Sequence, residues 1–272
     1  MTRTQAVASA IGLFAVWMLA TYLLEARVGT FLKPDATSRF VYTVVANVLI
    51  GTVGAALIIR AVSRWAELPR LTTYGIVDRS RILVLIPVAA LLAGLFLIGQ
   101  ELPTWDPVIL ANASAQVLVV SIAEVVVCWA LFGAVLRNAL GPGVVFAGFA
   151  AVSAALVFGV YHFAHSPPFN TPAMVWLLSG VGLATGVFFF LGGDLYSTIV
   201  LHNAFAVRGV VQALGESGAC HAALPKRHDR CGNATLRDRC RDVSRSVSSE
   251  ICAADLSNRQ NRRLKPAAGQ GS

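Results

Sequence analysis

Long apolar runs follow one another through the first 214 residues of the chain. The hydrocarbon core of a bilayer is about 30 Å thick, so a spanning helix needs roughly 20 apolar residues. Lipid offers no partner to an unpaired backbone group, which favours helices as spanning elements. Such runs occur at residues 5–24, 40–63, 82–100, 111–136, 144–164, 171–192 and 195–214. The pattern predicts an all-α, polytopic membrane protein with about seven transmembrane helices.

The composition supports this class of protein. Of the 272 residues, 56% are hydrophobic and only 13% are charged, whereas soluble domains carry about 25% charged residues. The net charge of +8 often points to nucleic acid in such a chain, but 11 of the 22 Lys and Arg and 5 of the 14 Asp and Glu lie in residues 217–272. We therefore expect no nucleic-acid partner, a transmembrane domain over 1–216 and a basic tail over 217–272.

The basic tail contains few large apolar side chains, so it cannot bury enough surface to fold alone and is predicted to be disordered. Its cysteines, Cys220, Cys231, Cys240 and Cys252, lack the Cys-x-x-Cys spacing of a zinc knuckle. Apolar character stops abruptly near Gly215, as a shifted reading frame would produce. An apolar continuation in another frame would distinguish that origin from a native tail attracted to anionic lipid.

Ionisable side chains are rare inside the predicted spans. Glu124 lies near the middle of the fourth run and is the only acid between Asp106 and Asp194. A charged carboxylate at that depth costs about 2.5–3.5 kcal/mol, so it faces protein groups or water and indicates a functional site. A protonated Glu124 bonded to a neighbouring helix is the structural alternative. His162 lies near the end of the fifth run and His202 about eight residues into the last. A carboxylate and two imidazoles can activate water directly, or can hold zinc with water in the open position.

Glu124, then Phe158 with His162 four residues later, then His202 follow one another along three predicted spans. Over residues 111–210 this order resembles the CPBP family, also called ABI, of CAAX-processing and bacteriocin-processing intramembrane endopeptidases. The family's motifs read Glu-Glu-x-x-x-Arg, Phe-x-x-x-His and His-x-x-x-Asn, and the second is intact here. The resemblance implies that Glu124 and His162 activate the water that attacks a peptide carbonyl, and that His202 stabilises the oxyanion.

The first motif is incomplete in either of two registers. If Glu124 is the first Glu, Val125 and Trp129 replace the second Glu and the Arg. If Glu124 is the second Glu, Ala123 and Cys128 replace the first Glu and the Arg. We prefer the register in which Glu124 comes first, because it keeps the glutamate to which the resemblance assigns the role of general base.

The third motif has Ala206 in place of Asn, and Asn203 lies about one sixth of a turn away from it around the helix. A general base contributes about 10²–10⁴-fold to a rate and an oxyanion donor about 10²–10³-fold, so these departures bear on turnover. Two functions stay open: an intramembrane endopeptidase, or a catalytically inactive relative that acts as a membrane binding or scaffolding protein. A transporter with a Glu/His proton relay is disfavoured, because no span is visibly paired with an inverted twin.

The endopeptidase interpretation predicts no cofactor and no metal; zinc held by Glu124, His162 and His202 is the alternative. The expected partners are the lipid bilayer and a membrane-associated peptide or protein substrate. Prenylated CAAX ends, bacteriocin precursors and other membrane peptides fit the sequence equally. Five arginines lie between residues 60 and 81, which places this loop in the cytoplasm by the positive-inside rule. The expected location is the plasma membrane, which is the cytoplasmic membrane of a bacterium.

Overall fold

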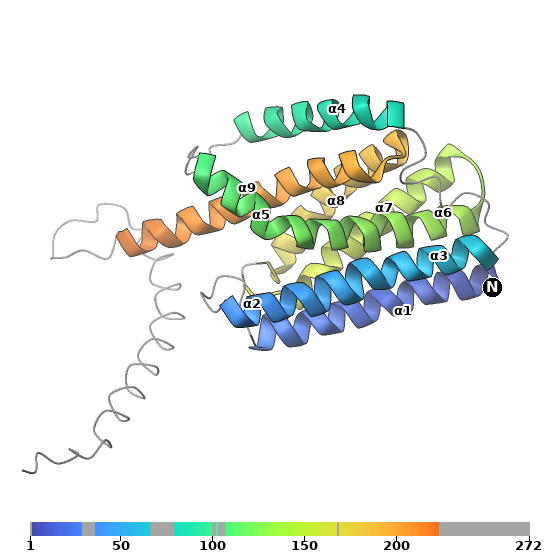
Figure 1. Ribbon diagram of the computed structural model, residues 1–272, viewed down its shortest axis with the longest axis horizontal. Coiled ribbons are helices and arrows are strands. Elements are labelled where there is room, and N and C mark those ends of the chain that lie inside the picture. Colours follow the sequence, from blue (N-terminus) through green and yellow to red (C-terminus); the bar gives the residue numbers. More distant parts are fainter. Residues whose placement is uncertain are drawn as a thin grey trace, which may run out of the picture. The chain divides into compact units, whose positions relative to one another are not determined.

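The computed structural model describes residues 2–28, 36–65, 79–99, 102, 107–167 and 169–222, and these residues form helices and no strands (Figure 1). The α-helices are α1 (Arg3–Thr21), α2 (Ala36–Tyr42), α3 (Ala55–Trp65), α4 (Arg79–Ile98), α5 (Pro107–Glu124), α6 (Ala134–Leu140), α7 (Val144–Tyr161), α8 (Pro172–Gly192) and α9 (Leu195–Ala222). π-Helical segments continue several of them, namely η1 (Tyr22–Val28), η2 (Thr43–Gly54) and η4 (Val125–Gly133). A 3-10 turn, η5 (His162–Ala164), follows α7.

The predicted all-α, polytopic membrane fold is confirmed. Within the described residues, 5 helices are long and apolar enough to cross a bilayer: Arg3–Glu25, Phe40–Ser63, Val117–Leu140, Val144–Ala164 and Pro172–Gly192. Two shorter apolar helices, Ile82–Ile98 and Leu195–Val211, fall within the other two predicted runs. A helix of roughly 17 residues is about 25 Å long, slightly less than the apolar core of a bilayer.

The chain divides into two compact units, Met1–Ala213 and Leu214–Ser272. Helix α9 runs on to Ala222, so residues 217–222 of the predicted disordered tail are helical. The remainder of the tail, 223–272, lies outside the described residues, together with the predictions of disorder and of a shifted frame.

Turns between the later helices form where the sequence supplies helix breakers and caps. Gly141 and Gly143 adopt φ of 119° and 132° between α6 and α7, a backbone conformation that side chains with a Cβ rarely adopt. Thr171 caps α8 by accepting from the backbone of its first turn, and Pro172 occupies the first turn, where its missing N–H costs nothing. Gly193, with φ of 64°, ends α8 in a left-handed conformation. These turns bring α7, α8 and α9 into succession beside one another (Figure 1).

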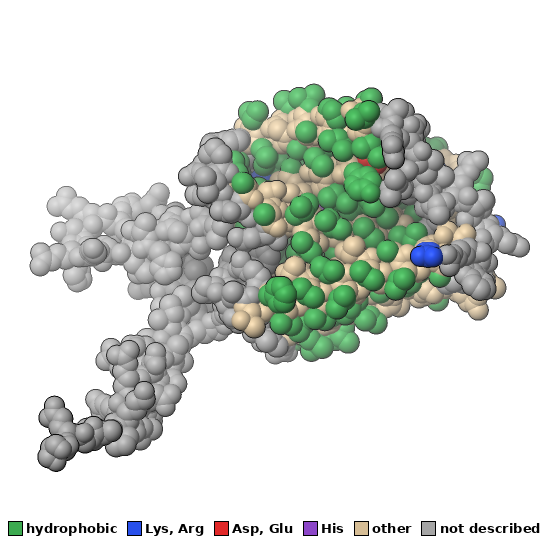
Figure 2. All heavy atoms as spheres, viewed as in Figure 1, with side chains coloured by type: hydrophobic (Ala, Val, Ile, Leu, Met, Phe, Trp, Pro, Cys, Tyr) green, Lys and Arg blue, Asp and Glu red, His purple; other side chains and the backbone are tan. Residues whose placement is uncertain are grey.

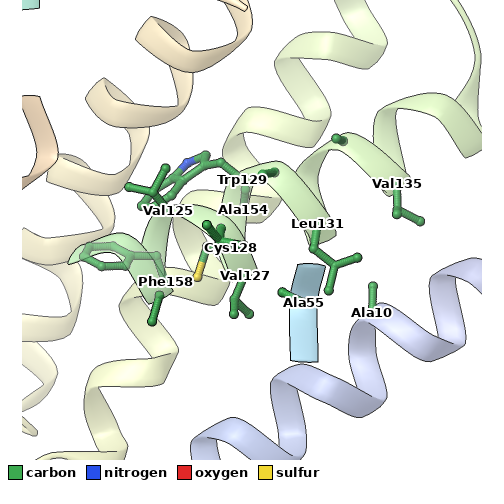
Figure 3. Packing of buried hydrophobic residues seen from close by; sticks show 14 of the residues in the cluster. Ala10, Ala55, Val125, Val127, Cys128, Trp129, Leu131, Val135, Ala154 and Phe158 are labelled. Carbon is green, nitrogen blue, oxygen red and sulfur yellow. The ribbon is translucent and has the colours of Figure 1, made fainter. Parts of the chain in front are cut away.

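Val117–Leu140 is the most enclosed of the long spans, because 78% of it is buried, against 17% to 39% for the other four. Its π-helical part, η4, contacts α1, α3 and α7. Figure 3 shows Cys128 and Leu131 of η4 among side chains from these helices, including Ala10 and Ala55. Large apolar side chains also cover much of the surface of the described residues (Figure 2), as a surface that faces lipid requires.

Helices α7 and α8 lie against each other, and glycines of α8 permit the close approach of α8 to α7 and to η4. A Cβ at Gly182 would lie 2.8 Å from the ring of Phe158, and one at Gly186 would lie 2.9 Å from Nε1 of Trp129. Gly180, in contrast, has nothing within 4 Å of a Cβ position. Small residues at such contacts let helices pack closely in lipid, and here they place two aromatic rings beside the polar centre of the domain.

Candidate active site

The structure brings the three predicted site residues together. Glu124 ends α5, His162 follows α7 as the first residue of η5, and His202 lies in α9. Glu124 Oε2 is 3.0 Å from His202 Nε2, and Glu124 Oε1 is 3.8 Å from His162 Nε2. All three residues are at most 7% exposed. Glu124 lies where α5 passes into η4, near the middle of the continuous helix that α5, η4 and α6 form from Pro107 to Leu140.

The hydrogen bonding of His162 fixes its neutral tautomer. Its Nδ1 is 2.9 Å from the carbonyl oxygen of Phe158, and a carbonyl only accepts, so Nδ1 carries the proton. The Nε2 lone pair then faces Glu124 Oε1 across 3.8 Å, which exceeds a direct hydrogen bond. One water molecule is able to donate to both atoms at this separation.

A proton count assigns the bond between Glu124 and His202. Thr185 Oγ1 donates its single hydrogen to the Val181 carbonyl at 3.0 Å and lies 3.2 Å from His202 Nδ1. Nδ1 must therefore donate to Thr185, which leaves Nε2 without a proton in a neutral ring. Since Nε2 also bonds Glu124 Oε2 at 3.0 Å, one further proton lies between the two groups. Glu124 and His202 form a pair that shares this proton and carries no net charge.

Aromatic rings surround the polar residues. Phe158 contacts both imidazoles, with ring centroids 4.7 Å from His162 and 5.1 Å from His202. Trp129 lies 5.2 Å from His202 and 5.2 Å from Phe158, and Figure 3 shows its indole beside Phe158. Such surroundings lower the local dielectric constant and strengthen the hydrogen bonds inside them.

The residues that stand in place of the missing Glu and Arg of the first motif belong to the apolar core. Val125 and Trp129 are fully buried members of the central cluster, and Cys128 lies in the same cluster. Ala123 packs against η2, where a Cβ on Gly51 would be 2.9 Å from its own Cβ. The polar centre is therefore built on Glu124 alone among these neighbouring positions.

Asn203 does not take the place of the absent third-motif Asn. Its amide nitrogen donates to Ser114 Oγ at 2.7 Å, and its amide oxygen accepts from Ser121 Oγ at 3.4 Å. Both serines belong to α5, so the amide holds α9 to α5. Ala206, at the Asn position, packs against an apolar cluster of the same two helices.

A second set of buried polar groups adjoins His162 and was not predicted as part of the site. The rings of His162 and His165 stack with centroids 5.1 Å apart. Tyr42 Oη lies 3.3 Å from His165 Nε2 and 3.5 Å from Tyr161 Oη, and Tyr161 Oη lies 3.1 Å from Thr21 Oγ1. The three-residue spacing between His162 and His165 was the available signal, since it places both on one side of a helical turn. His165 lies one residue beyond its span, and burial together with His162 lowers its pKa, so its ring is neutral at pH 7.

Glu25 is a buried acid that the sequence prediction also missed. It is 2% exposed and accepts hydrogen bonds from the backbone N–H of Ser166 at 2.7 Å and from its hydroxyl at 2.6 Å. These bonds tie η1 to Ser166, the residue directly after the segment that carries His162 and His165. Glu25 lies one residue past the predicted first run, and its position at the end of an apolar run was the only signal for its role.

Comparison of the chain with protein-family models, with curated proteins and with solved structures finds no match. Within the described part of the chain, no group of three or more His, Cys, Asp or Glu side chains has an arrangement suited to a metal ion.

Proposed function

We propose that the protein is an intramembrane endopeptidase of the CAAX-processing and bacteriocin-processing type, as the resemblance to the CPBP family implies. The observation that supports this function best is the convergence of Glu124 with His162 and His202 from three helices, at 3.8 Å and 3.0 Å. A carboxylate beside a neutral imidazole with a free lone pair is an arrangement that activates water.

In the proposed reaction, a water molecule donates one hydrogen to Glu124 Oε1 and the other to His162 Nε2. As its oxygen attacks the peptide carbonyl carbon, His162 takes the proton and becomes an imidazolium, which its Nδ1–H bond to Phe158 keeps in orientation. The carbon–nitrogen bond then breaks, and His162 returns the proton to the leaving amine. One water is consumed for each peptide bond, and the site recovers its first protonation state.

His202 has a supporting role in this scheme. Its bond to Glu124 shares a proton, which leaves the Glu124–His202 pair without net charge in its apolar surroundings. By the resemblance, the His202 Nε2–H would also stabilise the oxyanion formed on the substrate carbonyl. Thr185 orients the ring for both tasks by accepting from Nδ1.

The proposed substrate is a membrane-associated peptide or protein tail. Glu124 and His162 lie within helices that are long and apolar enough to span a bilayer, and His202 lies in the shorter apolar helix Leu195–Val211. A substrate that partitions into lipid therefore reaches the site at a high local concentration. Prenylated CAAX ends and unprenylated membrane peptides both satisfy this condition. We propose the plasma membrane, which is the cytoplasmic membrane of a bacterium, as the location.

The test is cleavage of a panel of quenched fluorescent peptides by the full chain in lipid nanodiscs. One half of the panel carries a farnesylated CAAX end and the other half an unprenylated apolar segment. We expect Glu124→Gln and His162→Ala to reduce cleavage by about 10²-fold or more. Asn138→Ala is the matched control, because in the described structure its side chain donates to the carbonyl of Ala134 on its own helix, away from the site.

Two outcomes of this experiment would contradict the proposal. Equal cleavage by the wild type and Glu124→Gln across the panel would exclude peptide hydrolysis at this site. Inhibition by 1,10-phenanthroline that zinc reverses would replace the metal-free mechanism with the zinc alternative held by Glu124, His162 and His202. We expect no effect of the chelator.

The second candidate function is a catalytically inactive relative that binds or scaffolds a membrane partner. The observation in its favour is that Val125, Trp129 and Ala206 occupy motif positions as buried or partly buried core residues. Under this alternative, Glu124→Gln leaves binding of the peptides unchanged, and no panel peptide is cleaved by the wild type.

A further inference from the structure

The first span carries a row of buried residues along one side. Trp17, Thr21 and Glu25 follow one another at intervals of four residues, and their exposed fractions are 0%, 0% and 2%. Residues four apart are neighbours on the same side of a helix. Large apolar residues on other sides of this span, such as Ile11 and Leu19, are exposed, as expected where a helix faces lipid. The row that ends at Glu25 therefore faces protein.

All three residues of the row contact one short segment, 161–166, which carries His162. The ring of Trp17 stacks on that of Tyr161, with centroids 3.7 Å apart and planes at 10°. One turn later in the first span, Thr21 Oγ1 lies 3.1 Å from Tyr161 Oη. These two contacts hold the residue directly before His162, one through its ring face and one through its hydroxyl.

Glu25 holds the other end of the same segment. Both oxygens of its carboxylate accept from Ser166, one from the backbone N–H at 2.7 Å and one from the hydroxyl at 2.6 Å. Hydrogen bonds of these lengths to a carboxylate are among the strong ones in proteins. Ser166 lies four residues after His162 and is 4% exposed. The first span thus holds the chain on both sides of His162.

His162 stands where a helix ends, which is a weak position for the base of the proposed reaction. It is the C-cap of α7 and the first residue of η5. The last carbonyl groups of a helix lack partners within the helix, and helix ends open more easily than their middles. One such carbonyl, that of Phe158, accepts from His162 Nδ1 at 2.9 Å. Unwinding of this end would separate the two groups, so the orientation of the base depends on what holds the segment.

We propose that the first span forms part of the active site and that Glu25 is the positioning residue that keeps His162 in its water-activating orientation. The inference rests on the proposed endopeptidase function, because it concerns how the base of that reaction is held. Glu25 acts through Ser166 and the segment 161–166, not through a proton transfer of its own. Since Glu25 does not bind the substrate in this role, its loss lowers kcat and leaves KM unchanged.

The experiment compares Glu25→Met and Glu25→Gln with the wild type, using the farnesylated and unprenylated quenched peptides in nanodiscs. Methionine has a similar length and removes both carboxylate oxygens, whereas glutamine keeps an oxygen for the Ser166 N–H and an amide that can donate to its hydroxyl. We expect Glu25→Met to lower kcat by about 10- to 10²-fold at an unchanged KM. Glu25→Gln should keep most of the wild-type rate, because positioning needs the hydrogen bonds and not an ionisable group.

A second measurement, ¹⁵N NMR of labelled histidine, follows His162 without any peptide. The wild type should show the His162 proton on Nδ1, and Glu25→Met should show a mixture in which Nε2 also carries it. A loss of stability alone lowers the melting temperature and leaves the tautomer in the folded protein unchanged. Ser166→Ala removes only the hydroxyl bond and should show a smaller change of the same kind in both measurements. It decides the question if Glu25→Met does not fold.

Asp194→Leu is the matched control for the histidine spectra. Asp194 is also a buried carboxylate, 3% exposed, and it accepts from the backbone N–H of a serine, Ser197, at 2.6 Å. This bond caps the start of α9, so its loss should lower the melting temperature. The His162 tautomer should stay that of the wild type.

Wild-type tautomer and kcat in both Glu25→Met and Ser166→Ala would overturn the role of Glu25 and leave the proposed function standing. Equal losses of cleavage in Glu25→Gln and Glu25→Met would also overturn it, because Glu25 would then act through its own proton. Absence of Glu124-dependent cleavage by the wild type would instead overturn the proposed function, and the histidine spectra would still test whether Glu25 orients His162.

Discussion

Replacing Thr185 with valine tests the proton assignment at His202, because it removes one hydroxyl and leaves the side-chain shape almost unchanged. Thr185 Oγ1 accepts from His202 Nδ1 at 3.2 Å in a site where His202 is 2% exposed. In Thr185→Val this N–H loses its acceptor, and a buried donor without a partner costs about 1–3 kcal/mol. The ring avoids this cost by moving its proton to Nε2, which faces Glu124. The pair then no longer shares an additional proton.

The expected result is a loss of cleavage of about 10-fold or more, since each 1.4 kcal/mol corresponds to a factor of about ten in rate. Thr198→Val is the matched control: its hydroxyl donates to the Asp194 carbonyl at 2.6 Å, four residues earlier, just as that of Thr185 donates to Val181. Both threonines are fully buried, so the control carries only the cost of one lost bond, about 0.5–1.5 kcal/mol.

The measurements are peptide cleavage, thermal unfolding in detergent and ¹⁵N NMR of labelled histidine. The wild type should show His202 with a proton on Nδ1, and Thr185→Val should show it on Nε2. If the two valine variants have equal cleavage rates and His202 keeps the same tautomer in both, the shared-proton pair is refuted.

Two further predictions concern stability. Gly186→Ala should destabilise the protein by about 1–3 kcal/mol, because its Cβ would lie 2.9 Å from Trp129 Nε1. Gly148→Ala is the control and should have little effect, because nothing lies within 4 Å of a Cβ there. Equal melting temperatures of the two variants would contradict the close packing of Gly186 against Trp129. His165 binds its proton less tightly when folded, because burial lowers its pKa from the ordinary value of 6.5. The contribution of the neutral His165 ring to the free energy of unfolding is therefore fully present above pH 6.5 and is lost as the pH falls below this value. The melting temperature should drop more steeply between pH 7 and 5 in the wild type than in His165→Gln, and parallel curves would exclude this origin.

The spans could be predicted from the sequence because lipid imposes a simple requirement on length and polarity. Each predicted run corresponds to an apolar helix in the structure. Glu124 was equally visible, as an acid isolated in an apolar run. In lipid, a polar residue marks a position that faces protein, and few other signals do so.

The arrangement of the spans could not be predicted in the same way. Helices in a soluble protein show which side is buried by their apolar stripe, but here both the core of Val117–Leu140 and the lipid-facing surface are apolar. The change from α5 to π-helical η4 directly after Glu124 also alters the hydrogen-bond register and so the direction of later side chains. Glu25 of η1 reaches the turn beside His162 through such a segment, and a regular helical period gives no warning of this.

The departures from the first motif can be understood as a pair. By the resemblance to the CPBP family, in the preferred register, Val125 stands where the family has an acid and Trp129 where it has the Arg that supports that acid four residues later. Removing one member of a buried ion pair leaves an uncompensated charge, whereas replacing both with apolar side chains is often neutral or stabilising. Both replacements are buried in the core cluster, and Glu124 obtains its compensation from His202 at 3.0 Å. The charge of the site is thus balanced without the missing pair, so these two losses alone do not argue against catalysis. By the resemblance, the remaining departure is Ala206 in place of the Asn that would bind the oxyanion, and within the described structure Ala206 packs against the apolar cluster of α5 and α9.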